Sequence, residues 1–191
     1  MRDQLTSARH GIRTAPRRPQ MGSVRVRQLV TLTAVSAFFV LLVAGGAASA
    51  LSITTAAITL PEVTLNGTDQ TISGTTTAWR VDANGETGGW NVTVSSGSFT
   101  NGGSGTIDVS NFEVRLLDAD IVLVSGDPTV PGSTQTTFAA LSATPLKIAS
   151  AASGTGNGVY DLTPSFRLTV PAEVVTGSFS ATLTVLVSAG P

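Results

Sequence analysis

The sequence predicts an all-β protein whose main domain is an antiparallel β-sandwich, and three observations lead to that prediction. After residue 50 the chain is rich in Thr, Val, Ser and Gly, which are typical of strands and tight turns. Short apolar runs there alternate with polar residues in period two and are separated by turn residues. No stretch after residue 50 shows the 3.6-residue apolar period of an amphipathic helix.

The first predicted element, residues 1–50, is a secretory signal peptide. Seven arginines precede residue 28, opposed only by Asp3, and no charged residue occurs over residues 28–61. That uncharged stretch contains an apolar run of about 15 residues, expected to be helical, and ends in Ala48-Ser49-Ala50, the small-residue pattern that signal peptidase accepts. We therefore expect cleavage after Ala50. The alternative is an uncleaved N-terminal anchor, although the run is shorter than the ~18 to 20 residues that span a bilayer comfortably.

Residues 51–191 are predicted to form a single β-sandwich domain. Asn66-Gly67 and Asn84-Gly85 mark tight hairpin turns, and the glycine- and serine-rich residues 95–105 are expected to be a loop. Eight to ten short strands separated in this way are typical of a β-sandwich or barrel, and we expect a sandwich of the immunoglobulin-like, Greek-key type. The expected strands are residues 63–65, 70–73, 75–82, 90–94, 112–117, 121–124, 137–141, 146–149, 160–170 and 179–187.

The last expected strand, residues 179–187, shows the clearest pattern. Five apolar residues in period two should face the core, whereas Ser180, Thr182 and Thr184 should face solvent. We expect this strand to be a central part of the sandwich.

Composition excludes several classes of function. Residues 51–191 contain eleven acidic and four basic residues, a formal charge of −7, so nucleic acid and anionic lipid surfaces are not expected partners. The chain has no cysteine, and its one histidine, His10, lies in the predicted signal. Cysteine nucleophiles, histidine bases and histidine-ligated zinc are therefore absent from the domain, and no pair of carboxylates has a catalytic spacing. We expect a protein that is not an enzyme and needs no cofactor, with a membrane as partner only if the signal is retained.

Two groups of residues are candidate binding sites. Trp79 and Trp90 flank a turn, and either ring could serve as a platform for a sugar, although large aromatic residues on alternating strands more often pack in the core. Asp82, Asn84 and Glu86 place oxygen atoms at alternate positions around a glycine, as calcium loops do. A hairpin turn explains the same three residues without a metal.

Two segments carry a family resemblance. The C-terminal pattern reads L-T-V-P at residues 168–171, then G-S-F at residues 177–179 and A-T-L-T at residues 181–184, and Trp90-Asn91-Val92 lies on an upstream strand. This arrangement resembles the WxL domain of Gram-positive surface proteins. In this chain Val92 stands where the first W-x-L signature has leucine, and Val185 stands where the second has tryptophan. The resemblance implies a secreted β-rich module that attaches non-covalently to the cell wall and works beside other surface proteins.

Together these observations predict an extracellular protein of the cell wall or cell surface that binds peptidoglycan or a wall polymer without catalysing a reaction. A structural subunit that assembles into a surface layer or fibre is the alternative, because Thr- and Val-rich terminal strands can pair at sheet edges. Other surface proteins are further expected partners.

Overall fold

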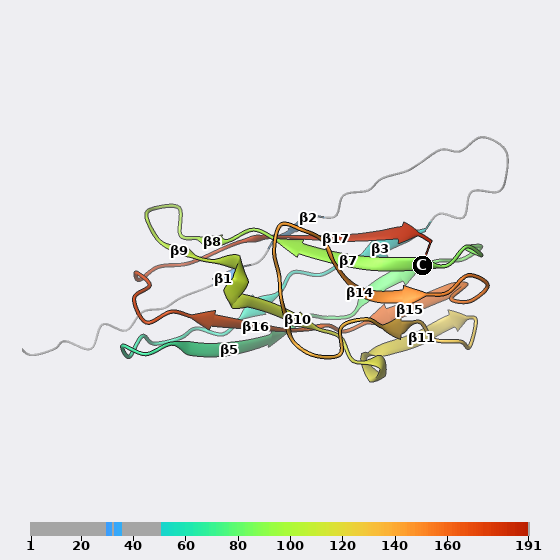
Figure 1. The fold of residues 1–191 in the computed structure, drawn as a ribbon, viewed down its shortest axis with the longest axis horizontal. Coiled ribbons are helices and arrows are strands. Elements are labelled where there is room, and N and C mark those ends of the chain that lie inside the picture. Colours follow the sequence, from blue (N-terminus) through green and yellow to red (C-terminus); the bar gives the residue numbers. More distant parts are fainter. Residues whose placement is uncertain (1–29, 32, 36–50, 191) are drawn as a thin grey trace, which may run out of the picture.

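In a computed structural model of the chain, which describes residues 30–31, 33–35 and 51–190, strands dominate and the all-β prediction is confirmed. Two layers of strands pack face to face, and the pairing within them is antiparallel except between β2 and β17. In Figure 1, β7, β14 and β17 lie in the upper part of the picture and β5, β16 and β11 in the lower part, whereas β3 lies beside β17. The upper layer has the order β12-β14-β7-β17-β2. Its strands are β2 (Thr33–Val35), β7 (Trp90–Ser96), β12 (Gly132–Ser133), β14 (Leu146–Ala151) and β17 (Thr182–Ala189).

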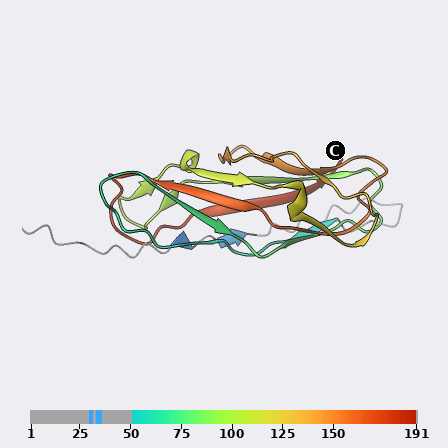
Figure 2. The same ribbon diagram turned by 90° about the horizontal axis from the view of Figure 1, so that it is seen from below.

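The lower layer consists of two four-stranded sheets whose strands are interleaved along the chain, in the orders β13-β10-β16-β5 and β11-β15-β6-β3. Figure 2 shows the molecule from below, from the side on which β5 and β16 lie in Figure 1. The first sheet of the lower layer contains β5 (Gln70–Thr75), β10 (Phe112–Arg115), β13 (Ala139–Ala140) and β16 (Ser165–Val170). Its second sheet contains β3 (Ser52–Thr54), β6 (Trp79–Asp82), β11 (Ile121–Gly126) and β15 (Gly158–Leu162).

Short elements complete the description. The strand pair β1–β4 lies beside β5, and the pair β8–β9 forms a small hairpin. Two single-turn 3-10 helices flank β10. These elements are β1 (Val30–Thr31), β4 (Thr59–Leu60), β8 (Phe99–Thr100), β9 (Thr106–Ile107), η1 (Val109–Asn111) and η2 (Asp118–Asp120).

One strand that the sequence predicted is divided into two strands of the lower layer. Residues 160–170, predicted as one strand, divide into β15 and β16 at Thr163-Pro164. Proline has no N–H for the ladder, and the N–H of Thr163 bonds instead to the carbonyl of Asp120 at 2.9 Å. Other expected elements were also wrong. Residues 63–65 form no strand, and β6 begins at Trp79, four residues after the expected start at residue 75. β8 lies inside the loop expected over residues 95–105, and β17 begins three residues after position 179.

An aromatic row fills the core between the layers. Phe99 meets Phe112 edge-on at 5.1 Å, Phe112 stacks on Phe166 at 5.4 Å, and Phe166 contacts Trp79 at 5.8 Å between ring centroids. All four rings are fully buried. The buried apolar residues for which the structure describes burial lie between Ile58 and Val185.

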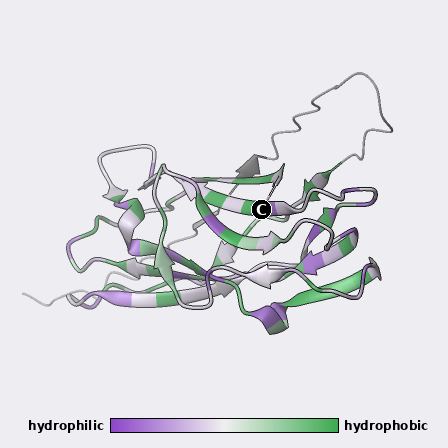
Figure 3. Ribbon diagram, turned by 45° about the vertical axis from the view of Figure 1, so that its right-hand side comes forward, coloured by the Kyte–Doolittle hydropathy of each residue, from purple (hydrophilic) through white to green (hydrophobic). Residues whose placement is uncertain are grey.

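The predicted faces of the last strand are confirmed. Leu183 and Val185 are buried, Thr182 and Thr184 are exposed, and Figure 3 shows the same alternation of hydropathy along several strands. The strand is less central than expected, however, because β17 is next to last in its sheet, between β7 and β2.

The signal predicted over residues 1–50 lies almost wholly outside the described residues. Its five described residues are in strands β1 and β2, where a helix was expected. β1 pairs with β4 in a separate two-stranded sheet, and β2 pairs in parallel with β17 at the edge of the upper layer.

Candidate functional site

The two tryptophans proposed as sugar platforms are both core residues. Trp79 and Trp90 are 0% exposed, so neither ring has a free face on which a sugar could stack. Trp90 contacts Tyr160 at 5.9 Å and donates its indole N–H to the carbonyl of Gly156 at 2.8 Å. The Trp79 indole nitrogen is buried without a hydrogen-bond partner among the described residues. The alternative expectation, that both tryptophans pack in the core, is therefore the correct one.

The turn proposed as a calcium loop is held by its own hydrogen bonds. Asp82 Oδ1 accepts from the backbone N–H and the side-chain amide of Asn84, at 3.1 and 2.8 Å. Glu86 Oε1 accepts from the backbone N–H of Gly88 at 2.7 Å. Among the residues that the structure describes, no three acidic, His or Cys side chains gather as a metal site would require. Asp82 ends β6, and Asn84 and Glu86 lie in the turn that joins β6 to β7. This turn is not the expected hairpin, because β6 and β7 belong to different sheets.

A different site lies on the outer face of the β13-β10-β16-β5 sheet. Register places Glu113 of β10 opposite Arg167 of β16, and Arg115 opposite Ser165. Because side chains alternate along a strand, these four point away from the core, whereas Phe112, Val114 and Phe166 point into it.

Phe138 is the centre of this cluster. Its half-buried ring lies just before β13, and the guanidinium carbons of Arg115 and Arg167 lie over it at 4.6 and 4.4 Å from the ring centroid. Such contacts are attractive because the ring face is electron-rich. We refer to Glu113, Arg115, Phe138 and Arg167 as the Phe138 cluster.

The two arginines of the cluster differ in their electrostatic environment. Arg167 Nε donates to Glu113 Oε2 at 2.6 Å, and this hydrogen bond raises the pKa of Arg167. Arg115 forms no ion pair with any described residue, and its buried Nε has no hydrogen-bond partner there. The Phe138 cluster therefore carries one positive charge beyond what its own carboxylate neutralises.

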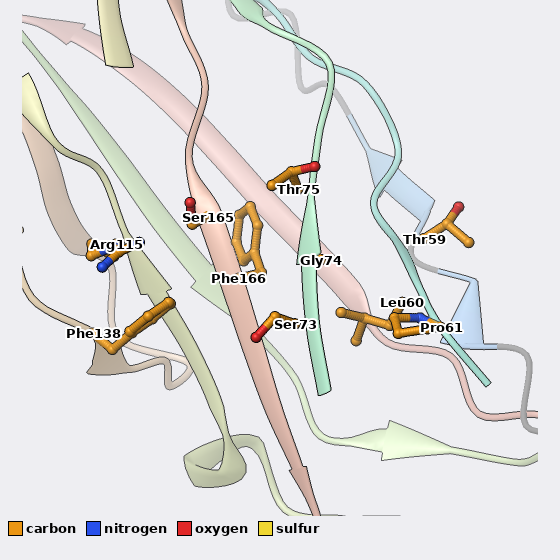
Figure 4. Close-up of a pocket in the computed structure, with 10 residues that line it drawn as sticks. All are labelled: Thr59, Leu60, Pro61, Ser73, Gly74, Thr75, Arg115, Phe138, Ser165 and Phe166. Carbon is orange, nitrogen blue, oxygen red and sulfur yellow. The ribbon is translucent and has the colours of Figure 1, made fainter. Parts of the chain in front are cut away.

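A shallow groove of about 620 Å³ begins at this cluster. Figure 4 shows Arg115 and Phe138 on one side of it, β16 and β5 across its middle, and β4 on the other side. Hydroxyl groups line its middle, and an apolar rim closes the far side. The lining residues are Thr59, Leu60, Pro61, Ser73, Gly74, Thr75, Arg115, Phe138, Ser165 and Phe166.

Gly74 shapes the far side of the groove. A Cβ atom at this position would come within 2.8 Å of a methyl carbon of Leu60 and 3.1 Å of the Thr59 carbonyl oxygen. Because glycine lacks that atom, β4 can lie close against β5 and form the rim.

The Phe138 cluster escaped the sequence analysis for a physical reason. Its members are spread over residues 113–167 and come together only through strand register. Two of the four basic residues of the domain belong to the cluster, and this scarcity of basic residues was the one feature of the composition that could have pointed to it.

The described part of the chain contains no helix long and apolar enough to cross a membrane. No protein-family model matches the chain, and no curated protein matches it.

Proposed function

We propose that this chain is an exported, non-enzymatic surface protein whose domain of residues 51–191 attaches non-covalently to the cell wall, through an anionic wall polymer bound at the Phe138 cluster. The observation that carries the proposal is the uncompensated Arg115 guanidinium at one end of a hydroxyl-lined groove.

Charge supports an anionic ligand. The domain has a formal charge of −7, so a negatively charged polymer is repelled by most of its surface. At the Phe138 cluster two guanidinium groups contact one ring, and only one of them has a carboxylate partner. A planar guanidinium matches phosphate or carboxylate oxygens with two parallel hydrogen bonds. An anionic polymer is therefore expected to bind at the Phe138 cluster, where the guanidinium groups attract it, rather than elsewhere on the acidic surface.

The groove supports a polymer of sugars or polyols. Ser73, Thr75 and Ser165 line its middle, and hydroxyl groups can both donate to and accept from the hydroxyls of a carbohydrate. The groove is open and extends across β16 and β5, so a chain could continue beyond both ends. A repeating polymer of the cell wall has that form, and the WxL-like segments support the wall as its location.

Sedimentation with washed cell walls tests the proposal. Residues 51–191 should pellet with complete walls at low salt, and should stay in solution when the anionic polymers have been extracted from the walls. Raising the salt concentration should release the bound protein because the attraction is between charges. Equal pelleting of the protein with complete and extracted walls would contradict an anionic ligand. Assembly of the protein itself into fibres or layers in the absence of walls would favour the structural-subunit alternative.

A further inference from the structure

The beginning of the outer edge of β17, residues 182–184, is paired with a segment that export is expected to remove. β2 pairs in parallel with β17, with Thr33, Ala34 and Val35 in register with Thr182, Leu183 and Thr184. All five described residues before position 51 belong to the predicted signal. Cleavage after Ala50 would therefore leave β17 as an edge strand of the order β12-β14-β7-β17.

Hydrogen bonding shows which backbone groups that edge would expose. Gly190 N–H bonds to Gly89 O at 2.8 Å, and Gly97 N–H bonds to Thr182 O at 3.3 Å. In an antiparallel ladder, alternate residues bond to the same neighbour, so the even-numbered residues of β17 bond to β7. The N–H and C=O groups of Leu183, Val185 and Val187 consequently point away from β7, toward the position of β2.

We propose that removal of residues 1–50 opens the edge of β17 to β17 of a second copy, which pairs with it antiparallel about a twofold axis. In the full chain β2 pairs with residues 182–184 of this edge, so it occupies part of the stretch that the second copy needs. The inference rests on removal of the signal and is independent of wall binding, because the Phe138 cluster lies on the other layer.

A second copy is the occupant that suits the strand's chemistry. β17 contains no charged residue and no proline along its eight residues, so two copies meet without repulsion along the strand and without a missing donor. Leu186 points outward and is 41% exposed. With the axis at Leu186, residue 185 pairs with 187 and residue 183 with 189 of the other copy, and the two Leu186 side chains cover each other.

The other exposed apolar edge, β11, is less suited to the same pairing. Val122 and Val124 are 56% and 47% exposed there, and Figure 3 shows this strand as largely hydrophobic. A bulge between Leu123 and Ser125 interrupts its register. Acidic residues stand at both of its ends, Asp118 and Asp120 at one and Asp127 at the other, so antiparallel pairing of two copies would bring like charges together.

Disulfide trapping provides the test, since the chain has no cysteine of its own. Leu186→Cys in residues 51–191 should cross-link under mild oxidation, because residues opposite each other in a non-hydrogen-bonded pair have Cα atoms about 4.5 Å apart, within disulfide range. Val122→Cys is the matched control on the β11 edge, and we expect it to cross-link at least tenfold more slowly. Equal rates for the two variants would overturn the proposal.

The unmodified protein gives a second readout. Light scattering after gel filtration should show residues 51–191 passing from one to two copies as concentration rises, and an excess of a peptide of residues 28–36 should return it to one copy. A protein that stays monomeric at every concentration would overturn the proposal. A peptide that binds the protein but leaves the proportion of dimer unchanged would also overturn it. Neither result bears on wall binding, which is measured separately.

Discussion

The two sheets of the lower layer each carry an arginine–carboxylate pair on their outer face, and the pairs differ in what surrounds them. Arg80 meets Asp161 through two parallel hydrogen bonds of 2.8 Å, from Nε to Oδ1 and from Nη2 to Oδ2. Arg167 meets Glu113 through one contact of 2.6 Å beside a second arginine and an aromatic ring. In the first pair the two charges neutralise each other. In the second, the charge of the neighbouring Arg115 has no carboxylate partner among the described residues. Only the second is therefore suited to an anionic ligand.

The largest effect on binding is expected from Arg115→Ala. Losing a charge-assisted hydrogen bond to the ligand costs about 1.5 to 3 kcal/mol, so affinity for the anionic wall polymer should fall about tenfold or more. Titration of a soluble wall polymer, followed by calorimetry, measures this change. Arg115→Lys, which keeps the charge but not the planar fork, should lie between the two proteins. If Arg115→Ala bound the polymer as tightly as the wild type, the claim that the face with Arg115 binds the ligand and the face with Arg80 does not would be wrong.

Phe138→Ala should have an intermediate effect. Without the ring, the guanidinium groups of Arg115 and Arg167 lose the surface that holds them in place, and affinity should fall about two- to fivefold. Thermal unfolding of the same variant controls for damage to the fold. An affinity loss accompanied by an equal loss of folded protein would contradict a role of Phe138 in presenting the arginines.

Glu113→Gln should strengthen binding. The substitution removes the carboxylate that partly neutralises the cluster, and at low salt affinity should rise about twofold. The rise should vanish at high salt. Weaker binding by Glu113→Gln at low salt would show that this carboxylate orients Arg167 more than it neutralises it.

Arg80→Gln should leave wall binding unchanged and should affect only stability. The hydrogen bond from Arg80 holds the pKa of Asp161 below its ordinary range. A lowered carboxyl pKa in the folded state stabilises the protein above the unfolded pKa, and that stabilisation disappears as pH falls through the folded pKa. Melting temperatures of the wild type and Arg80→Gln should therefore differ slightly at neutral pH and converge in acid. A difference that persists in acid would contradict this origin.

The sequence was sufficient to predict the fold class because local patterns determine it. Period-two alternation identified the buried face of β17, including Leu183 and Val185, before any tertiary contact was known. The division of residues 160–170 was harder to anticipate, because the bend depends on the contact between Thr163 and Asp120 as well as on Pro164.

The candidate site could not be predicted in the same way. Trp79 and Trp90 attracted attention as rare aromatic residues, yet both pack in the core, where large rings bury most apolar area. Arg115 and Phe138 have no sequence motif. They become neighbours because β13 pairs with β10 in one register, a long-range fact that alternation alone does not contain.

Mapping the amides that respond to the wall polymer tests the central claim most directly. In proton–nitrogen spectra of residues 51–191 titrated with a soluble anionic wall polymer, the largest shifts should fall on residues 73–75, 113–115, 138–140 and 165–167, which surround the Phe138 cluster. Arg115→Ala should abolish those shifts, while Arg80→Gln should leave them in place. Shifts confined to the surroundings of Arg80 and Asp161, or to the edge of β17, would contradict the assignment of the binding face.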